Sequence, residues 1–431
     1  MSAVARAWRK LWFEPVPLPR LAALRLILVG YVLFDLVVDP IGNRPLGRVG
    51  EPFWNPDELV ITRELHLPRT PDELWLPLWG TLLVLALLAF AGLFTRLALW
   101  LLAFGYAWWV LMFMAHATVG HGRLPLVISL FALAIAPSGR ALSLDAVIAR
   151  ARGARAGEPL PAPEAERDAL AGWAVRFIGI ALVLIYLSAA LAKVRTAGLD
   201  WAFDGALDAA LVEQGTTLGR FLAESPHLVH LLALSAFVWE ATAWAVLLGG
   251  RIRDAWVLFG VCFHIGSLGL LEVNFLDYVV VYAAFYRLED GIAWLGARVR
   301  AWSTSRLDKI EVGYDGMCGL CVRAVTFLRD LDWLDRLRPS DATATDGTRL
   351  QVFVAHDSEH RHEGFLAYRR IARAVPVLWP MVPLLYLPGV SHLGHRVYDQ
   401  VAANRGSSCS IEACAVRRVR VGATASSAER R

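Results

Sequence analysis

Cysteine is scarce in this sequence and lies almost entirely at one end of it. The chain of 431 residues has five cysteines, and four of them follow residue 317: Cys318, Cys321, Cys409 and Cys414. Small secreted domains held together by disulfides carry more cysteine over a shorter length. The sequence therefore excludes such a scaffold and confines thiol chemistry to the carboxyl-terminal region.

Net charge is also low. The 43 basic residues nearly balance the 39 acidic ones, which leaves a net charge of +4. The basic residues cluster between hydrophobic runs, a pattern that indicates membrane topology and no nucleic-acid partner. The basic N-terminus also lacks the short apolar core and small-residue cleavage site of a signal peptide. Residues 1–17 are therefore expected to form a retained interfacial helix.

Apolar residues, by contrast, are abundant: 56% of the chain is hydrophobic, and the mean hydropathy is +0.46. A helix needs roughly 20 residues to cross a bilayer. Eight runs reach or approach that length: residues 18–38, 74–94, 97–119, 124–136, 173–192, 228–248, 255–271 and 275–286. The sequence predicts an α-helical polytopic membrane bundle of about eight spans over residues 18–288. The short fourth and eighth runs leave seven or eight open.

Arginine and lysine favour one side of these predicted spans, although the first connection, residues 40–72, holds four arginines on the other side, beside five acidic residues. On the favoured side they precede the first span, occupy the second, fourth and sixth connections, and follow the last span. The positive-inside rule makes this side cytoplasmic, so both termini are expected in the cytoplasm, with the protein in a bacterial inner membrane. Residues 151–168, rich in alanine, arginine, proline and glutamate, predict a disordered or mobile cytoplasmic loop.

After a linker over residues 289–307, the composition becomes that of a small soluble domain over residues 308–406. Two stretches predict strands, residues 309–314 and 350–356, and two predict helices, residues 364–374 and 392–404. Residues 375–387 are apolar and proline-rich, and we expect them to pack this domain onto the membrane face. Residues 407–431 form the expected C-terminal tail.

The stretch YDGMCGLC, from Tyr314 to Cys321, is the part of the sequence that most directly indicates a chemical function. It predicts the end of a strand, a turn at Asp315 and Gly316, and a helix that begins at the two cysteines. Unpaired N–H groups at a helix start favour an anion, and the thiolate is the nucleophile of disulfide exchange. Cys318 is expected to be the more exposed, attacking thiol, and Cys321 the resolving one.

A metal site is the alternative reading of the same cysteines. Four sulfurs could hold zinc: Cys318, Cys321, Cys409 and Cys414. The second pair is spaced C-x-x-x-x-C, which is looser than in most zinc ribbons, whereas the first pair lies between a predicted strand and helix as in redox domains. The second pair could instead serve as resolving thiols or belong to an uninvolved tail.

Ionisable residues within or beside membrane spans are costly and are therefore candidates for function. The sequence has six prominent ones: Asp35, His116, His121, Lys193, Glu240 and His264. Among these, His116, Glu240 and His264 are candidates for binding a cofactor. Each residue also has a structural reading, because lysine can extend to the interface and histidine can bridge helices.

The carboxyl-terminal region resembles a known family at both of its ends. YDGMCGLCVRAVTFLRDLD is similar to the opening of the DCC family of thiol-disulfide oxidoreductases, which have an aspartate and two cysteines at the spacing of Asp315, Cys318 and Cys321. The segment LPGVSHLGHRVYDQVAANRG resembles the closing helix of that family. The resemblance covers residues 308–406 and implies a thioredoxin-like α/β fold with dithiol chemistry.

The membrane region resembles the HTTM domain, the membrane module of the vitamin K-dependent gamma-carboxylase family. The resemblance rests on YLSAALAKVRTAGLDWAFDGAL, residues 186–207, and extends over residues 18–288. It implies that Lys193 is a catalytic base and that His121 matches a histidine of the family. It also implies a quinone or a vitamin K-like hydroquinone as cofactor.

Three functions follow from these patterns. The first is a membrane-bound thiol-disulfide oxidoreductase whose dithiol is coupled to, or anchored by, the membrane module. The second is a carboxylase- or epoxidase-like membrane enzyme with Lys193 as its base. The third is a non-catalytic maturation or immunity partner of a secreted peptide. The partners expected are the lipid bilayer, a quinone, and a thiol-bearing or peptide substrate.

Overall fold

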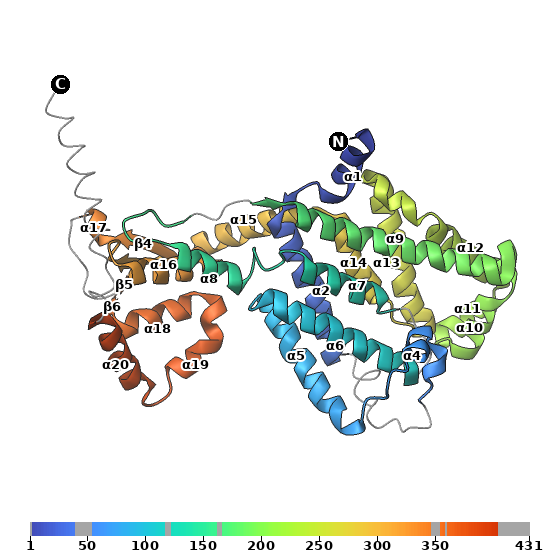
Figure 1. The fold of residues 1–431 in the computed structure, drawn as a ribbon, viewed down its shortest axis with the longest axis horizontal. Helices are drawn as coiled ribbons and strands as arrows, with labels where there is room; N and C mark the ends of the chain where they lie inside the picture. Colours follow the sequence, from blue (N-terminus) through green and yellow to red (C-terminus); the bar gives the residue numbers. More distant parts are fainter. Residues whose placement is uncertain are drawn as a thin grey trace. The chain divides into compact units, whose positions relative to one another are not determined.

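A computed structural model describes the chain as two compact units (Figure 1). The first unit comprises residues Met1–Leu144 and Ala165–Glu289, and the second comprises Asp145–Glu164 and Asp290–Arg431. The residues described are 2–38, 54–116, 122–161, 166–345, 354–357 and 360–403. The chain thus passes into the second unit twice, once from the middle of the first unit and once from its end.

Long apolar helices build the first unit, as the sequence predicts. Among the described residues, five helical segments are long and apolar enough to cross a membrane: α2 (Leu18–Val38), η4 with α5 (Asp72–Ala91), α6 (Thr95–His116), α9 (Ala169–Ala197) and α13 (Gly250–Leu271). Helix α2 is the most buried of them, and Leu21, Leu24 and Leu28 on it are fully buried. The core of this unit therefore forms around α2.

Three of the eight predicted spans are shorter or bent. They correspond to α7 (Leu124–Ile135), to α12 (Pro226–Ala241) followed by η6 (Ala243–Leu248), and to α14 (Leu276–Val281) followed by η7 (Tyr282–Phe285). Helix α12 also bends by 106° from α11 (Thr217–Ala223) at Ser225 and Pro226, where proline begins a new helix. Among the described residues the structure thus has five to seven candidate spans, and the two short helices α7 and α14 fall on the runs that the sequence marked as short.

Shorter elements complete the first unit: α1 (Ala3–Phe13), β1 (Val16–Pro17), η3 (Pro56–Glu58), α4 (Val60–Glu64), η4 (Asp72–Leu74), α5 (Trp75–Ala91), β2 (Arg167–Asp168), η5 (Gly198–Phe203) and α10 (Ala206–Gln214). Strands β1 and β2 pair antiparallel and so join the starts of α2 and α9. Helix α1 contacts α9 and leaves Trp8 and Leu11 exposed. That pattern suits the predicted interfacial helix, whose place in a bilayer stays a prediction.

The second unit is a small α/β domain. Its four strands are β3 (Ile310–Tyr314), β4 (Leu337–Asp341), β5 (Val354–His356) and β6 (Arg361–Glu363). The sheet order is β4-β3-β5-β6, in which β3 and β4 run parallel while the other two pairs are antiparallel. This arrangement agrees with the predicted thioredoxin-like α/β class. Strands β4 and β6 were not predicted, because short polar segments such as LRPSD carry no strand periodicity.

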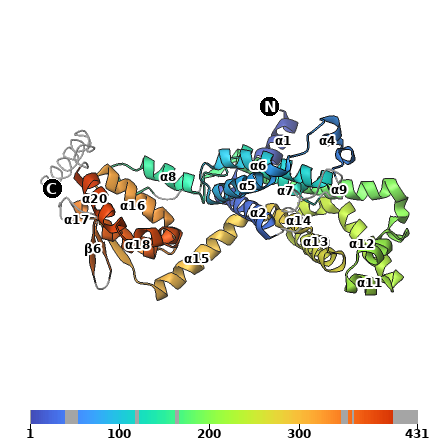
Figure 2. The same cartoon turned by 90° about the horizontal axis from the view of Figure 1, so that it is seen from below.

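Helices flank this sheet and extend from it. They are α15 (Leu288–Arg306), α16 (Gly319–Leu331), α17 (Ala342–Thr345), α18 (Phe365–Ala374), η8 (Pro376–Met381), α19 (Val382–Leu385) and α20 (Val390–Ala403). Figure 2 shows α15 as one uninterrupted helix across the predicted linker over residues 289–307. The stretch from residue 340 onward, which the family resemblance would fill with a longer helix, begins with the single short helix α17.

The connection after α7 corrects the predicted domain boundaries. It forms α8 (Leu144–Gly153), and residues up to Pro161 then follow the second unit rather than a mobile loop. Arg150 Nε lies 2.6 Å from Asp330 Oδ2, and the Asp330 side chain is only 2% exposed. Gly157 N donates to Gly316 O at 2.8 Å. These contacts order residues 151–161, while residues 162–165 lie outside the described part of the chain.

We predict that Arg150→Ala loosens this inserted segment. Losing a hydrogen bond to a charged group costs about 1.5 kcal/mol, which corresponds to roughly a tenfold larger open population. Trypsin should then cleave after the exposed Arg152 and Arg155 about ten times faster than in the wild type, as followed by mass spectrometry. Arg361→Ala, which removes an exposed ion pair with Glu363, is the control and should change nothing. Equal cleavage rates in all three proteins would contradict the prediction.

Candidate functional site

The cysteine motif lies at a turn between β3 and α16. Asp315 follows the last residue of β3, its Oδ1 accepts a hydrogen bond from Met317 N at 2.9 Å, and its carbonyl accepts one from Cys318 N at 3.1 Å. Gly316 N donates to Asp341 Oδ1 at 3.0 Å, which ties the turn to the end of β4. Cys318 is then the N-cap residue of α16. Asp315, predicted as catalytic, therefore shapes the turn that presents the first thiol.

Both thiols are free and buried. Cys318 is 3% exposed and Cys321 is 5% exposed, so the expectation that Cys318 is the more exposed thiol is wrong. The turn before Cys318 also has a distant neighbour, since Gly157 donates to Gly316 O and lies against Met317. A segment far away in the sequence thus covers the turn, which no local pattern could indicate.

The pKa of Cys318 is lowered to about 6. The largest cause is a hydrogen bond from the thiol of Cys321, and the backbone N–H groups of Cys321 and Leu320 add to it, whereas burial and the Asp315 carboxylate act in the opposite direction. These donors stabilise a thiolate at the start of the helix, as the sequence predicts. At neutral pH the Cys318 sulfur is therefore mainly in its nucleophilic form.

An apolar groove of about 260 Å³ opens beside the second thiol. Helices α16, α18 and α20 line it with these residues: Leu320, Cys321, Ala324, Phe365, Tyr368, Gly394, Val397, Tyr398 and Val401. A Cβ atom on Gly394 would lie 2.4 Å from the Phe365 ring, so the absence of a side chain there allows α20 to approach α18. The groove gives the dithiol an apolar approach on the Cys321 side.

In the first unit, two of the predicted residues form an ion pair. Lys193 on α9 contacts Glu240 on α12, and Glu240 is 6% exposed. The Lys193 ammonium also lies 4.7 Å from the centre of the Trp201 ring. Glu240 and Trp201 are therefore structural partners of the Lys193 ammonium.

His264 lies in a buried aromatic cluster next to this pair. Its Nε2 is 2.8 Å from Tyr186 Oη, which is 2.6 Å from Tyr282 Oη. Trp239, the neighbour of Glu240 in the sequence, packs against the His264 ring at 5.8 Å between centroids. His264 Nδ1 and Asp277 Oδ2 are buried without a hydrogen-bond partner among the described residues. The structure thus brings His264 into the region of Lys193 and Glu240.

His116 belongs to a different set of contacts. Its Nδ1 lies 2.8 Å from Met112 O, Arg69 Nε donates to its Nε2 at 3.2 Å, and Trp54 packs on it at 4.9 Å. His116 is therefore separate from His264, with which it was grouped as a cofactor candidate. Three other predicted site residues lie outside the described residues: His121, Cys409 and Cys414. The zinc alternative stays a prediction for that reason.

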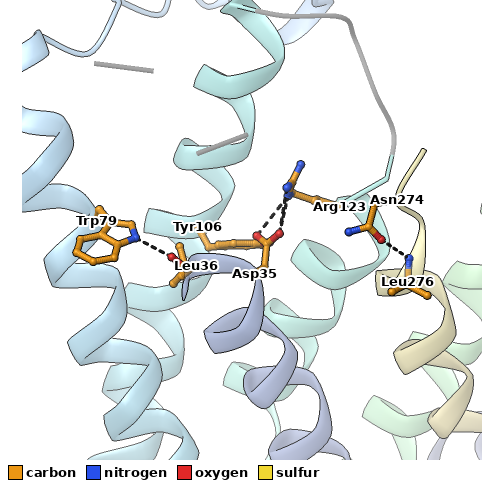
Figure 3. A network of polar contacts seen from close by, with 7 residues as sticks. All are labelled: Asp35, Leu36, Trp79, Tyr106, Arg123, Asn274 and Leu276. Carbon is orange, nitrogen blue, oxygen red and sulfur yellow. Dashed lines mark hydrogen bonds and ion pairs between the residues drawn. The ribbon is translucent and has the colours of Figure 1, made fainter. Parts of the chain in front are cut away.

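A third polar network surrounds the carboxylate of Asp35 at the end of α2. Figure 3 shows this carboxylate between Tyr106, whose hydroxyl donates to it at 2.6 Å, and Arg123, whose guanidinium lies 3.0 Å away. Asp35 is 3% exposed, so Arg123 neutralises a buried charge. This carboxylate has a structural partner and needs no ligand to explain it.

Several residues of these clusters were missed by the sequence analysis. Asp277 is an ionisable residue inside the predicted span over residues 275–286, so the criterion that selected Glu240 should have selected it as well. Arg123 stands just before the fourth predicted span, so the same criterion of an ionisable residue beside a span could have selected it. Tyr186 and Tyr282 gave no signal, because a tyrosine in a membrane helix is most often part of the packing.

Comparison with known families agrees with both halves of the structure. A model described as an HTTM domain matches residues 13–289, and one described as a DCC1-like thiol-disulfide oxidoreductase matches residues 312–410. No curated protein and no solved structure matches the chain. The two resemblances found in the sequence are thereby confirmed. The chain belongs to the HTTM family of integral membrane proteins and carries a DCC1-like thiol-disulfide oxidoreductase domain, which makes it a membrane-associated redox protein.

Proposed function

We propose that this protein is a membrane-bound thiol-disulfide oxidoreductase that cycles Cys318 and Cys321 between dithiol and disulfide. The observation that carries the proposal is the lowered pKa of Cys318, about 6, at the start of α16. Its main cause is the neighbouring thiol of Cys321, so the two cysteines act on each other before any substrate arrives. A purely structural pair of buried thiols would have no reason to stabilise a thiolate.

The exchange proceeds in two steps. The Cys318 thiolate attacks one sulfur of a substrate disulfide, forming a mixed disulfide while the other substrate sulfur leaves as a thiolate and takes up a proton. Cys321 then loses its proton and attacks Cys318 Sγ, which forms the protein disulfide and releases the second substrate thiol. The substrate gains two electrons and two protons, and the dithiol loses them. Reversing the steps oxidises a substrate dithiol.

Access to the thiols decides which substrates fit. The turn is covered on the side of Gly157, whereas the apolar groove reaches Cys321 between α16, α18 and α20. A substrate with an apolar group beside its sulfur could lie in the groove next to Cys321, and its sulfur would reach Cys318 from that side. We therefore propose an apolar thiol or disulfide, on a small molecule or a peptide, as the substrate class.

The first unit is proposed to hold a lipid-soluble redox partner. A quinone or a vitamin K-like hydroquinone exchanges two electrons and two protons when it is bound. His264 Nδ1 and Asp277 Oδ2 would hold its polar oxygens, because both atoms are buried and lack a partner among the described residues. The surrounding rings, including Tyr186 and Trp239, suit an aromatic ligand.

The orientation also belongs to the proposal. The arginine and lysine pattern supports cytoplasmic termini in a bacterial inner membrane. The dithiol then rests in its reduced form, since the cytoplasm keeps thiols reduced. The alternative in which Lys193 is a catalytic base with His121 gains no comparable support, because Lys193 is paired with Glu240. No observation favours a non-catalytic maturation or immunity partner.

We predict opposite outcomes for the two cysteine variants. In a background with serine at Cys262, Cys409 and Cys414, Cys321→Ala should stop at a mixed disulfide with a small aromatic disulfide, seen by mass spectrometry. The Cys318→Ser protein should not reduce that disulfide faster than buffer without protein does. The background protein itself is the control and should release two substrate thiols per chain. Undiminished exchange by the Cys318→Ser protein would end the proposal.

The pH dependence of thiolate formation gives a separate prediction. Thiolate absorbance, taken as the difference between wild type and Cys318→Ser, should rise with a midpoint at about pH 6. The rate of disulfide exchange should fall below that pH and level off above it, because only the thiolate attacks. Cys321→Ala removes the largest cause of the lowered pKa and should move the midpoint upward. A midpoint near about 8.5, the ordinary thiol value, in the wild type would contradict the assignment.

Lys193→Ala tests whether the ion pair of the first unit contributes to the thiol chemistry of the second unit. Removing one member of a buried pair costs about 3–5 kcal/mol, so the variant should unfold at a lower temperature, and adding Glu240→Gln should restore part of the loss. Disulfide exchange by Cys318 should remain at the wild-type rate in both proteins, measured under conditions where each is folded. Loss of exchange in the folded double variant would show that Lys193 takes part in the thiol chemistry.

A further inference from the structure

The helices that close the second unit expose large apolar side chains. Leu384, Leu387 and Leu393 are 60%, 50% and 62% exposed. Trp379 and Met381, on η8, are more than half exposed as well. Soluble surfaces rarely gather this many large apolar side chains on neighbouring elements. The chain just before these elements packs into the domain, since Ile371 on α18 and Val375 are buried.

These segments form a helical hairpin with the length and apolarity of a membrane span. Residues Pro376–Leu385 and Val390–Ala402 bend by 111° at the break between them. Gly389, with a φ of +84°, lies within that break and takes a backbone conformation that favours glycine. The sharp bend rules out one straight crossing of a bilayer. It suits a hairpin that dips into a membrane from one side, with its backbone hydrogen bonds kept inside the helices.

Arginine outnumbers the acidic residues around the hairpin. Residues 363–399 contain four arginines and two acidic residues, Glu363 and Asp399, which stand at the two ends of this segment. The guanidinium groups of Arg369 and Arg373 lie 3.6 Å and 4.3 Å from the centre of the Tyr386 ring. Arginine beside tyrosine and tryptophan is the composition of the headgroup layer, where anionic phosphates meet apolar chains. The surface is therefore complementary to an anionic lipid layer in both polarity and charge.

From these observations we infer that residues 376–393 insert into the headgroup and acyl boundary of the bilayer, with Arg369 and Arg373 at the level of the phosphates. The occupant is lipid because the chain is an integral membrane protein, so a bilayer is always present at high local concentration. A second copy of the chain would instead bring two arginine-rich surfaces together, and these repel each other. The insertion makes the second unit a monotopic membrane domain in its own right.

The insertion bears on the proposed function through the groove beside Cys321. Helix α20 carries Leu393 on the hairpin and Val397 in the groove, and both side chains are at least half exposed. An inserted hairpin therefore brings the mouth of the groove to the hydrocarbon. If the dithiol performs the proposed exchange, a groove that opens to the hydrocarbon assigns it a substrate dissolved in the lipid. This step rests on the proposed function.

The test labels the full chain in nanodiscs. All five cysteines are replaced by serine, and a single Leu384→Cys carries an environment-sensitive fluorophore; Arg361→Cys on β6 is the matched control in the same unit. The discs contain phosphatidylcholine and phosphatidylglycerol, with or without nitroxide on the acyl chains. Label at position 384 should be quenched by the lipid nitroxide and protected from aqueous iodide, and label at position 361 should show the reverse. The wild-type trypsin pattern checks that the background folds.

Two outcomes would overturn the inference. Iodide quenching at position 384 equal to that at position 361 would leave the hairpin in water. Energy transfer between two labelled copies, without lipid quenching, would assign the surface to a second copy. Removing phosphatidylglycerol should weaken the lipid quenching, and Arg373→Glu should weaken it further, because the arginines contact phosphate. The labelled protein has no dithiol, so the result does not depend on whether Cys318 performs exchange.

Discussion

A charged side chain carried inward by an apolar helix must find its partner within the protein, because hydrocarbon offers none. The first unit obeys this constraint at two places. Asp35 is neutralised by Arg123, with Tyr106 completing its hydrogen bonds, and Glu240 is neutralised by Lys193. These pairs fix helices that come from distant parts of the sequence. They also show why an ionisable residue in a membrane helix need not be catalytic.

In the second unit, hydrogen-bond donors rather than a cation stabilise the negative charge of a thiolate. At Cys318 the negative charge has no cation beside it, and the donors are a thiol and backbone N–H groups at the start of α16. Such a charge can be gained and lost with a proton or a disulfide bond, whereas an ion pair holds its charges permanently. The two units thus stabilise negative charge by different means, ion pairs in the first and hydrogen-bond donors in the second. Asp315 supports the dithiol by shaping the turn, although its carboxylate opposes the thiolate.

The inserted segment links the two units through the chain itself. Residues 145–161 leave the first unit after α7, bind the second unit through Arg150 and Gly157, and lead back toward α9. The segment that contacts the turn before Cys318 is therefore continuous in the chain with helices of the first unit.

The sequence by itself determined the membrane helices, the strand and helix around the cysteines, and the position of Cys318 at the start of that helix. Each of these depends on a local pattern: apolar length, a change of period, or unpaired N–H groups at a helix start. The tertiary structure alone decided the burial of Cys318, the place of residues 145–161, the pairing of Lys193, and the short strands β4 and β6. These depend on contacts between residues far apart in the sequence, such as Gly157 with Gly316, and composition carries no record of such contacts.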